Sequence, residues 1–212
     1  MTETLAIARD GSDPARVALE RWVASGGVAI FPSDGLYGLA CDPANPEAIE
    51  RIHELKGRDE RKPSAILYFS PLAMRELLAS LGPRSRDAIG ALLPGPATLL
   101  LANPEHRYPL ACRDDPGRIG VRLIEGPLAG AMCPVLQNSA NRSGEPAPTT
   151  FAEIDARLRS AVDLAIDGGK LGGLPSTVID LTAIETSGTW RILREGALPR
   201  EQLERRLAGA GL

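Results

Sequence analysis

Short runs of apolar residues, rich in aliphatic and β-branched side chains, recur along the chain at the length of a β-strand. Strands are expected at Val28–Phe31, Ala65–Phe69, Thr98–Leu101, Ile119–Leu123, Val162–Ile166, Thr177–Leu181 and Trp190–Leu193, with a further short strand from Val135. Along Arg118–Leu123 the alternation puts Arg118, Gly120 and Arg122 on one face and the apolar residues on the other. The pattern therefore predicts a core-facing strand whose opposite face carries two arginines.

Helical patterns lie between several of these runs. The first predicted helix begins at Asn45 and Pro46, continues with apolar residues at helical spacing, and ends at Gly57. Further helices are expected from Ser70–Pro71 to Gly82, from Thr150 with Phe151, Ile154 and Leu158 on one face, and over residues 199–212.

The alternation of strands and helices predicts an α/β fold, with helices packed on a twisted sheet. Closely spaced strands near the C-terminus indicate an antiparallel part, so the sheet is expected to be mixed. Because the chain contains no internal repeat and no linker rich in Gly, Ser or charge, residues 1–212 are expected to form a single domain.

Composition narrows the class of protein. The 212 residues include 24 Lys+Arg against 27 Asp+Glu, for a net charge of −3, and 43% are hydrophobic, which suits a globular domain. The longest apolar stretch, 91–102, is interrupted at Pro94, Gly95 and Pro96, so no membrane span is predicted. The first residues lack a basic start followed by an apolar run, so we expect a cytoplasmic protein without membrane contact.

Cysteine and histidine are too few and too scattered for several kinds of chemistry. Cys41, Cys112 and Cys133 lie far apart without CxxC spacing, which supports neither a disulfide framework nor a zinc site. His53 and His106 fall in no HExxH or GxSxG setting. We therefore predict no protein-bound metal site and no Ser-His-Asp triad.

Three polar segments carry candidate chemistry, each with a plain structural alternative. Ser33 and Asp34, beside Gly35, follow a strand, where either the Ser33 hydroxyl faces a ligand or both residues form a local turn. Residues 51–62 hold five Lys and Arg side chains, which form either a phosphate clamp or a solvated helix end. The polar loop within 135–148, which includes Ser139 and Asn141, either cradles phosphate or is only a surface loop.

Other candidates come from the arginines and from a glycine-rich segment. Arg118 and Arg122 face either solvent or a cleft that takes an anion. Residues 167–181 deliver Ser176 to a strand start, but they lack both the Walker A and the GxGxxG spacing. Arg194, at the end of a later strand, is a further candidate anion ligand.

These segments, in this order, resemble the YrdC/TsaC family of threonylcarbamoyl-AMP synthases over about residues 27–196. The matching stretches are FPSDGLYGLA, AIERIHELKGR, Lys62-Pro63, PGPATLLL, IGVRL, NSANRSGEPAPT, STVIDL and ILREG. The resemblance implies a YrdC-like twisted mixed sheet, flanked by helices around a deep cleft. It also implies an enzyme, a nucleotidyltransferase, that joins L-threonine, bicarbonate and ATP into threonylcarbamoyl-AMP with release of pyrophosphate, using Mg2+.

By the same resemblance, a downstream complex transfers the threonylcarbamoyl group to tRNA, and contact with RNA is possible. The resemblance implies that Lys56 and Arg58 are catalytic. It assigns ATP to Lys56, Arg58, Lys62, Ser139, Asn141 and Arg194, and threonine to Ser33, Arg122 and Ser176, with Gln137 and Arg118 as weaker assignments. The sequence departs from the family's usual residues at Ser33, at Ser64-Ala65 and at Asn138, which bears on substrate affinity.

Two alternatives remain. A YciO-like paralogue would share the fold without this activity, and residues 162–181 resemble that branch as well. A double-stranded RNA-binding module would use the basic residues of 51–62 with Arg118, Arg122 and Arg142 to grip a nucleic-acid backbone. Binding of that kind weakens steeply with salt, whereas threonine binding needs no RNA.

Overall fold

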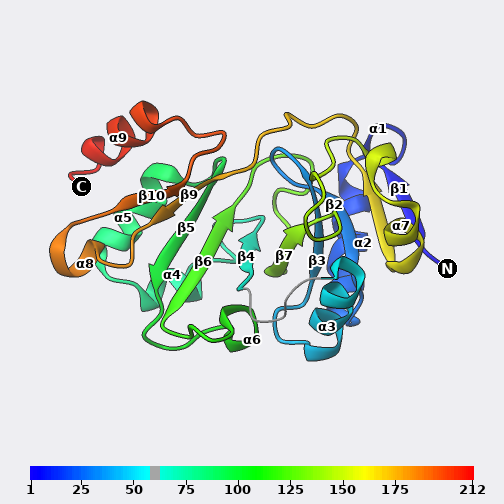
Figure 1. Ribbon diagram of the computed structural model, residues 1–212, viewed down its shortest axis with the longest axis horizontal. Helices are drawn as coiled ribbons and strands as arrows, with labels where there is room; N and C mark the ends of the chain where they lie inside the picture. The colour runs from blue at the N-terminus through cyan, green and yellow to red at the C-terminus, as the bar shows by residue number, and fades with distance from the viewer. Residues whose placement is uncertain (58–62) are drawn as a thin grey trace.

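A mixed β-sheet runs through the molecule from one end to the other (Figure 1). The computed structural model describes residues 1–57 and 63–212, and within them the sheet has ten strands. These are β1 (Glu3–Ala6), β2 (Ala29–Pro32), β3 (Tyr37–Cys41), β4 (Ala65–Tyr68), β5 (Ala97–Ala102), β6 (Arg118–Leu123), β7 (Val135–Ser139), β8 (Leu164–Asp167), β9 (Thr177–Asp180) and β10 (Arg191–Arg194).

The strand order is β1-β8-β2-β3-β7-β4-β6-β5-β9-β10. The pairs β1–β8, β8–β2, β4–β6 and β5–β9 are parallel, and the other five adjacent pairs are antiparallel. The predicted mixed α/β fold is therefore confirmed. All the strands predicted from apolar runs are present within two or three residues of their expected bounds, whereas β1 and β3 were not predicted.

Helices pack at both ends of the sheet. They are α1 (Ile7–Asp10), α2 (Ser12–Ala24), α3 (Pro46–Lys56), α4 (Arg75–Ser80), α5 (Pro83–Leu92), α6 (Pro109–Cys112), the 3-10 turn η1 (Phe151–Glu153), α7 (Ala156–Ala161), α8 (Ile184–Ser187) and α9 (Arg200–Gly209). In Figure 1, α5, α8 and α9 lie at the left end and α2, α3 and α7 at the right end. None of the helices in the described ranges is long and apolar enough to cross a membrane.

The first predicted helix forms as its end signals indicate. The Asn45 side chain accepts a hydrogen bond from the Ala48 backbone N–H at 3.0 Å, and Pro46 occupies the first turn. Gly57 adopts the left-handed conformation, with φ of 56°, and ends α3. The sequence pattern thus determines both where Lys56 lies and where its helix stops.

Two other predicted helices differ from expectation. The helix expected from Ser70 begins only at Arg75, because the preceding residues form turns that bond back to residues 70 and 71. The capping box at Thr150 and Glu153 is present, but the chain becomes extended at Ile154. Asp155 then caps a second helix, α7, by accepting from the Arg157 N–H at 2.7 Å, so one expected helix is two. Helices α2 and α5 were not predicted, whereas the amphipathic helix expected near the C-terminus is α9.

The two faces of the sheet carry different hydrophobic cores. Ile119, Val121 and Leu123 of β6 point into the larger core, together with buried residues of α3, α5 and α9. On the other face, α2 packs against a smaller core that includes Phe31 and Leu67. Because side chains alternate along a strand, Gly120 and Arg122 of β6 share this second face. The smaller core covers only part of this second face, and the uncovered part leaves room for a cavity.

Candidate functional site

A cavity of about 320 Å³ lies over the middle and later strands of the sheet. Its floor and walls come from the β2–β3 loop, from β4 to β7, from the segment before β9, and from β10. The polar residues that line it are Ser33, Asp34, Tyr37, Ser64, Thr98, Arg122, Gln137, Asn138, Ser139, Ser176 and Arg194. Five of the residues assigned to substrates by sequence resemblance line the cavity, namely Ser33, Arg122, Ser139, Ser176 and Arg194. Asn141 is not among the lining residues, and its Oδ1 accepts from Lys56 Nζ at 3.4 Å.

Arg122 is the most buried charged side chain of the cavity wall, with 6% of the residue exposed. Its Nη1 donates to Gln137 Oε1 at 2.9 Å, and its Nη2 forms an ion pair with Asp34. Within the described part of the chain, the buried Nε of Arg122 has no hydrogen-bond partner. A buried unpaired donor is costly, so this N–H is suited to an oxygen atom of a ligand.

A second cation, Arg194, faces the same cavity from β10. Its Nη2 donates to the Ser176 carbonyl oxygen at 2.8 Å, and the Ser176 hydroxyl lies 2.7 Å from the Thr98 hydroxyl. Burial first, and then the positive charge of Arg122, lower the pKa of the Arg194 guanidinium. Both arginines line the same cavity, and an anion bound between them would offset their positive charges.

The β2–β3 loop carries Ser33 and Asp34 and is held by its backbone. The Ser33 N–H donates to the Leu36 carbonyl at 3.1 Å, and the Gly173 N–H donates to the Gly35 carbonyl at 2.9 Å. A Cβ atom at Gly35 would overlap the Leu174 carbonyl oxygen, so the two loops meet at a distance that only glycine permits. The Ser33 hydroxyl donates to Asp34 Oδ1 at 3.3 Å, which combines a local turn contact with a position in the cavity wall.

Lys56 does not line the cavity, although sequence resemblance places it among the catalytic residues. Its ammonium group donates to the backbone carbonyl of Ser139 and, at 2.7 Å, to that of Asn141, and the residue is 3% exposed. The Ser143 N–H in turn donates to the Lys56 carbonyl at 2.7 Å. Lys56 therefore ties the end of α3 to the loop that follows β7, which presents Ser139 to the cavity.

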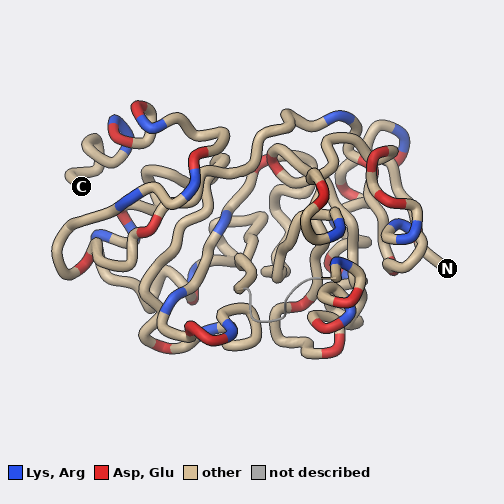
Figure 2. The backbone as a smooth tube through the Cα atoms, in the orientation of Figure 1, with Lys and Arg blue, Asp and Glu red and all other residues tan. Residues whose placement is uncertain are grey.

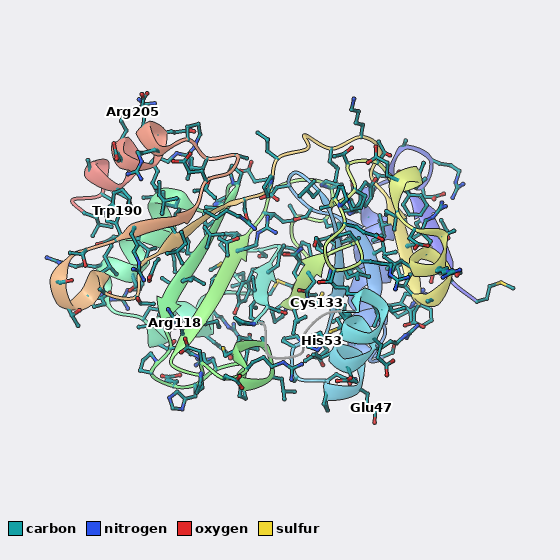
Figure 3. All side chains as sticks on the ribbon, viewed as in Figure 1. Glu47, His53, Arg118, Cys133, Trp190 and Arg205 are labelled. Atoms are coloured by element: carbon teal, nitrogen blue, oxygen red, sulfur yellow. The ribbon has the colours of Figure 1, made fainter. Side chains whose placement is uncertain are left out.

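Two of the expected phosphate ligands, Arg58 and Lys62, lie outside the described residues. Arg118, a weaker assignment, lies away from the cavity at the start of β6, near α6, and pairs with Asp115 (Figure 3). Gln137, the other weaker assignment, does line the cavity and holds Arg122.

The residues that depart from the family's usual pattern lie in two kinds of position. Ser33 is in the cavity wall. Ser64 and Asn138 contact each other through a hydrogen bond of 3.1 Å from Asn138 Nδ2 to Ser64 Oγ, and both residues are buried. Asn138 alternates with Gln137 and Ser139 on β7, so its side chain points to the opposite face of the sheet. Both residues nevertheless line part of the cavity, so these two departures bear on its wall as well as on the packing behind it.

Sequence reasoning gave no ligand role to three polar residues that line the cavity, namely Asp34, Tyr37 and Thr98. Asp34 was noted in its turn but not assigned to a ligand site, and Thr98 was not singled out. Thr98 alternates with the buried Ala97, Leu99 and Leu101, so a polar residue on the outward face of a buried strand was an available signal. For Asp34 no such signal exists, because its partner Arg122 lies 88 positions away.

The arrangement can bind anions without metal ligands from the protein. Within residues 1–57 and 63–212, no three His, Cys, Asp or Glu side chains form a group that could hold a metal ion. Two arginines and five Ser or Thr residues instead line the cavity beside a single carboxylate, Asp34. Such an excess of donors suits carboxylate and phosphate groups.

Comparison with known proteins gives relatives over most of the chain. The Sua5/yciO/yrdC family model, described as telomere recombination, matches residues 21–196. A threonylcarbamoyl-AMP synthase of Nitrosococcus oceani is 33% identical over 167 residues, which cover 76% of this chain and 89% of that protein.

Two solved structures share the fold at similar levels. Pyrococcus abyssi Sua5 complexed with L-threonine superposes with a TM-score of 0.80 at 28% identity, covering 97% of this chain and 60% of that one. Escherichia coli YciO also superposes with a TM-score of 0.80, at 26% identity, covering 96% of this chain and all of that one. The chain thus spans about 60% of Sua5 and the whole of YciO.

Proposed function

The chain belongs to the Sua5/YciO/YrdC family, and on that basis we propose that it is an enzyme that forms threonylcarbamoyl-AMP and pyrophosphate from L-threonine, bicarbonate and ATP. The product serves the threonylcarbamoyladenosine modification of tRNA, through a separate transfer complex. The observation that carries this proposal is that Arg122 and Arg194 line the same cavity. Among the described residues, the buried Nε of Arg122 has no hydrogen-bond partner.

Arg122 is the residue we assign to the threonine carboxylate. Gln137 orients its guanidinium from one side, and a carboxylate oxygen would complete the hydrogen bonding of Nε. Ser33 and Ser176, which line the same cavity, are assigned to the polar groups of threonine. The Sua5 structure, which contains L-threonine, supports this assignment through its shared fold.

We assign the nucleotide to Ser139 and Arg194, which line the cavity from β7 and β10. Lys56 holds the carbonyl groups of Ser139 and Asn141 at the end of β7. The roles of Arg58 and Lys62 at the phosphates rest on sequence resemblance alone. Magnesium is treated as part of the substrate, arriving with the triphosphate, whose oxygens bind it.

The proposed chemistry needs charge and position more than a base. The threonine ammonium group and bicarbonate form a carbamate, with release of one water molecule and one proton to solvent. A carbamate oxygen then attacks the α-phosphorus in line. The bond from the α-phosphorus to the bridging oxygen breaks, and pyrophosphate leaves as an anion. Arg194 and the other cations neutralise the developing charge, while the cavity wall holds the two reactants together.

Pyrophosphate release tests this function directly. Purified protein is incubated with ATP, Mg2+, L-threonine and bicarbonate, each is omitted in turn, and the nucleotide product is identified by mass. We expect release to depend on both threonine and bicarbonate, with a product of the mass of threonylcarbamoyl-AMP. Release without threonine, or none from a folded protein that binds nucleotide, would overturn the proposal.

A second candidate is a YciO-like paralogue of the same fold without this activity. The observation that favours it is the equal TM-score of the YciO structure, together with coverage of that whole chain. The same assay separates the candidates. An RNA-binding module receives less support, because Lys and Arg alternate with Asp and Glu along the chain at both ends of the molecule (Figure 2).

A further inference from the structure

The ion pair between Asp34 and Arg122 lies inside the cavity, where both residues line the wall. The Arg122 side chain is 8% exposed and that of Asp34 19% exposed, so the pair is largely withdrawn from water. Asp34 thus occupies one donor group of the arginine that we assign to the substrate carboxylate. Its own role is not explained by the assignments above.

Arg122 has a second partner besides Asp34. Gln137 accepts from Nη1 at 2.9 Å, and Gln137 Nε2 lies beside Gly38, where a Cβ atom would come within 3.0 Å of it. The unpaired Nε remains a donor for a ligand oxygen while Asp34 stays at Nη2. A ligand carboxylate can therefore bind Arg122 beside Asp34, and the two carboxylates would then share one guanidinium.

Asp34 is free to serve a second cation. Among the described residues, its side chain contacts only Arg122 and the Ser33 hydroxyl, and the turn backbone that carries it is fixed by other bonds. In an α-amino acid the ammonium group is bonded to the carbon that bears the carboxylate. A ligand carboxylate on Arg122 would therefore bring that ammonium group next to Asp34, where it offsets the repulsion between two carboxylates.

We propose that Asp34 determines specificity for the α-ammonium group, so that the cavity accepts an α-amino acid and discriminates against the corresponding α-hydroxy acid. This inference rests on the proposed function, in which the cavity binds L-threonine. The hydroxy acid brings the same carboxylate but no positive charge, which leaves Asp34 and the ligand carboxylate in repulsion across one guanidinium.

Calorimetric binding without nucleotide or bicarbonate tests the proposal. The ligands are L-threonine and 2,3-dihydroxybutyrate of the same stereochemistry, and the proteins are the wild type, Asp34→Asn and Asp34→Glu. We expect the wild type to prefer threonine by about tenfold or more, the worth of one ionic contact. Asp34→Asn should bind the two ligands within about threefold of each other, and Asp34→Glu should restore part of the preference.

Arg122→Gln should lose both ligands, which separates carboxylate recognition from ammonium recognition. Thermal unfolding of each variant verifies that it is folded. An unchanged preference in folded Asp34→Asn, or no preference in the wild type, would overturn the inference. If the wild type shows the preference but releases no pyrophosphate with ATP and bicarbonate, the proposed function fails while the role of Asp34 stands.

Discussion

The two ends of β6 carry the same side chain on the same face of the sheet, yet they are different environments. At the start of the strand, the Arg118 side chain is 49% exposed and pairs with Asp115, three residues before it. Four residues further along, the Arg122 side chain is 8% exposed and is held by Asp34 and Gln137. Period-two alternation places both arginines on one face but says nothing of what covers that face.

The difference comes from the neighbours that each end meets. The sheet order puts β4 between β6 and β7, and Arg122 reaches past β4 to Gln137. The β2–β3 loop adds Asp34 from 88 positions away. Among the described residues, Arg118 pairs only with a local partner, and an exposed ion pair of that kind contributes little to stability. Long-range neighbours therefore distinguish Arg122, the residue that we assign to the substrate carboxylate, from Arg118 on the same strand.

Substituting each arginine in turn should give the largest effect, because it tests directly whether Arg122 and Arg118 contribute differently to activity. Arg122→Gln removes charged hydrogen bonds from a buried site, worth about 3 kcal/mol, so kcat/KM for threonine-dependent pyrophosphate release should fall about 100-fold. Arg118→Gln should change it less than about twofold. Equal losses from the two variants, both folded by circular dichroism, would contradict the distinction between the two ends.

The free energy of unfolding should fall at alkaline pH because Tyr37, which lines the cavity, is buried. Its hydroxyl accepts from the Gly168 N–H at 2.9 Å and donates to the Gly169 carbonyl at 2.7 Å. Burial is the main cause that raises the pKa of Tyr37 from 10.0 to about 12. The folded state therefore keeps the proton that the unfolded state loses, and the contribution is present below pH 10 and lost as pH rises towards 12.

The expected loss is about 2–3 kcal/mol of unfolding free energy between pH 10 and 12. Urea unfolding at intervals across this range measures it. Tyr37→Phe, which cannot ionise, should be less stable at neutral pH but should show a flatter pH dependence. An identical slope in the two proteins would show that other groups account for the alkaline loss.

Lys56, which is buried, and Lys170, which is exposed, provide a matched pair of substitutions. Lys56→Met leaves the carbonyls of Ser139 and Asn141 without their donor, so the loop should lose its fixed position. The KM for ATP should rise about tenfold, close to 1.4 kcal/mol, while binding of threonine alone changes little. The exposed Lys170→Met is the control and should behave as wild type. A rise in the threonine Kd equal to that in the ATP KM would refute the assignment.

The smallest effect is expected from a methyl group at the loop contact. Gly35→Ala places a Cβ against the Leu174 carbonyl and should shift Ser33 and Asp34, which lowers kcat/KM about threefold to fivefold, roughly 1 kcal/mol. Gly172→Ala, in the neighbouring loop, meets open space and is the matched control. If both variants keep full activity, close contact between the loops is not needed for the site.

Local signals were enough for most elements of the fold. Asn45, Pro46 and Gly57 mark α3, because capping and left-handed glycine act within a few residues. The strands predicted from apolar runs are present for the same reason. The errors arise where local signals compete: Asp155 starts a new helix within one expected helix, and β3, which is buried on both faces, lacks the alternation that marks a half-exposed strand.

The amino-acid sequence was sufficient to predict a mixed α/β fold. It was also sufficient to identify the segments that carry Ser33, Arg122, Ser139, Ser176 and Arg194. Hydrophobic periodicity, end signals and motif order are properties of neighbouring residues, so they can be read without the fold. The fold was needed to show that Arg118 is exposed, that Arg122 is buried beside Asp34, and that Lys56 binds the carbonyls at the end of β7. The contacts of Arg122 with Asp34 and of Lys56 with Ser139 and Asn141 join residues 83 to 88 positions apart, which the sheet order brings together.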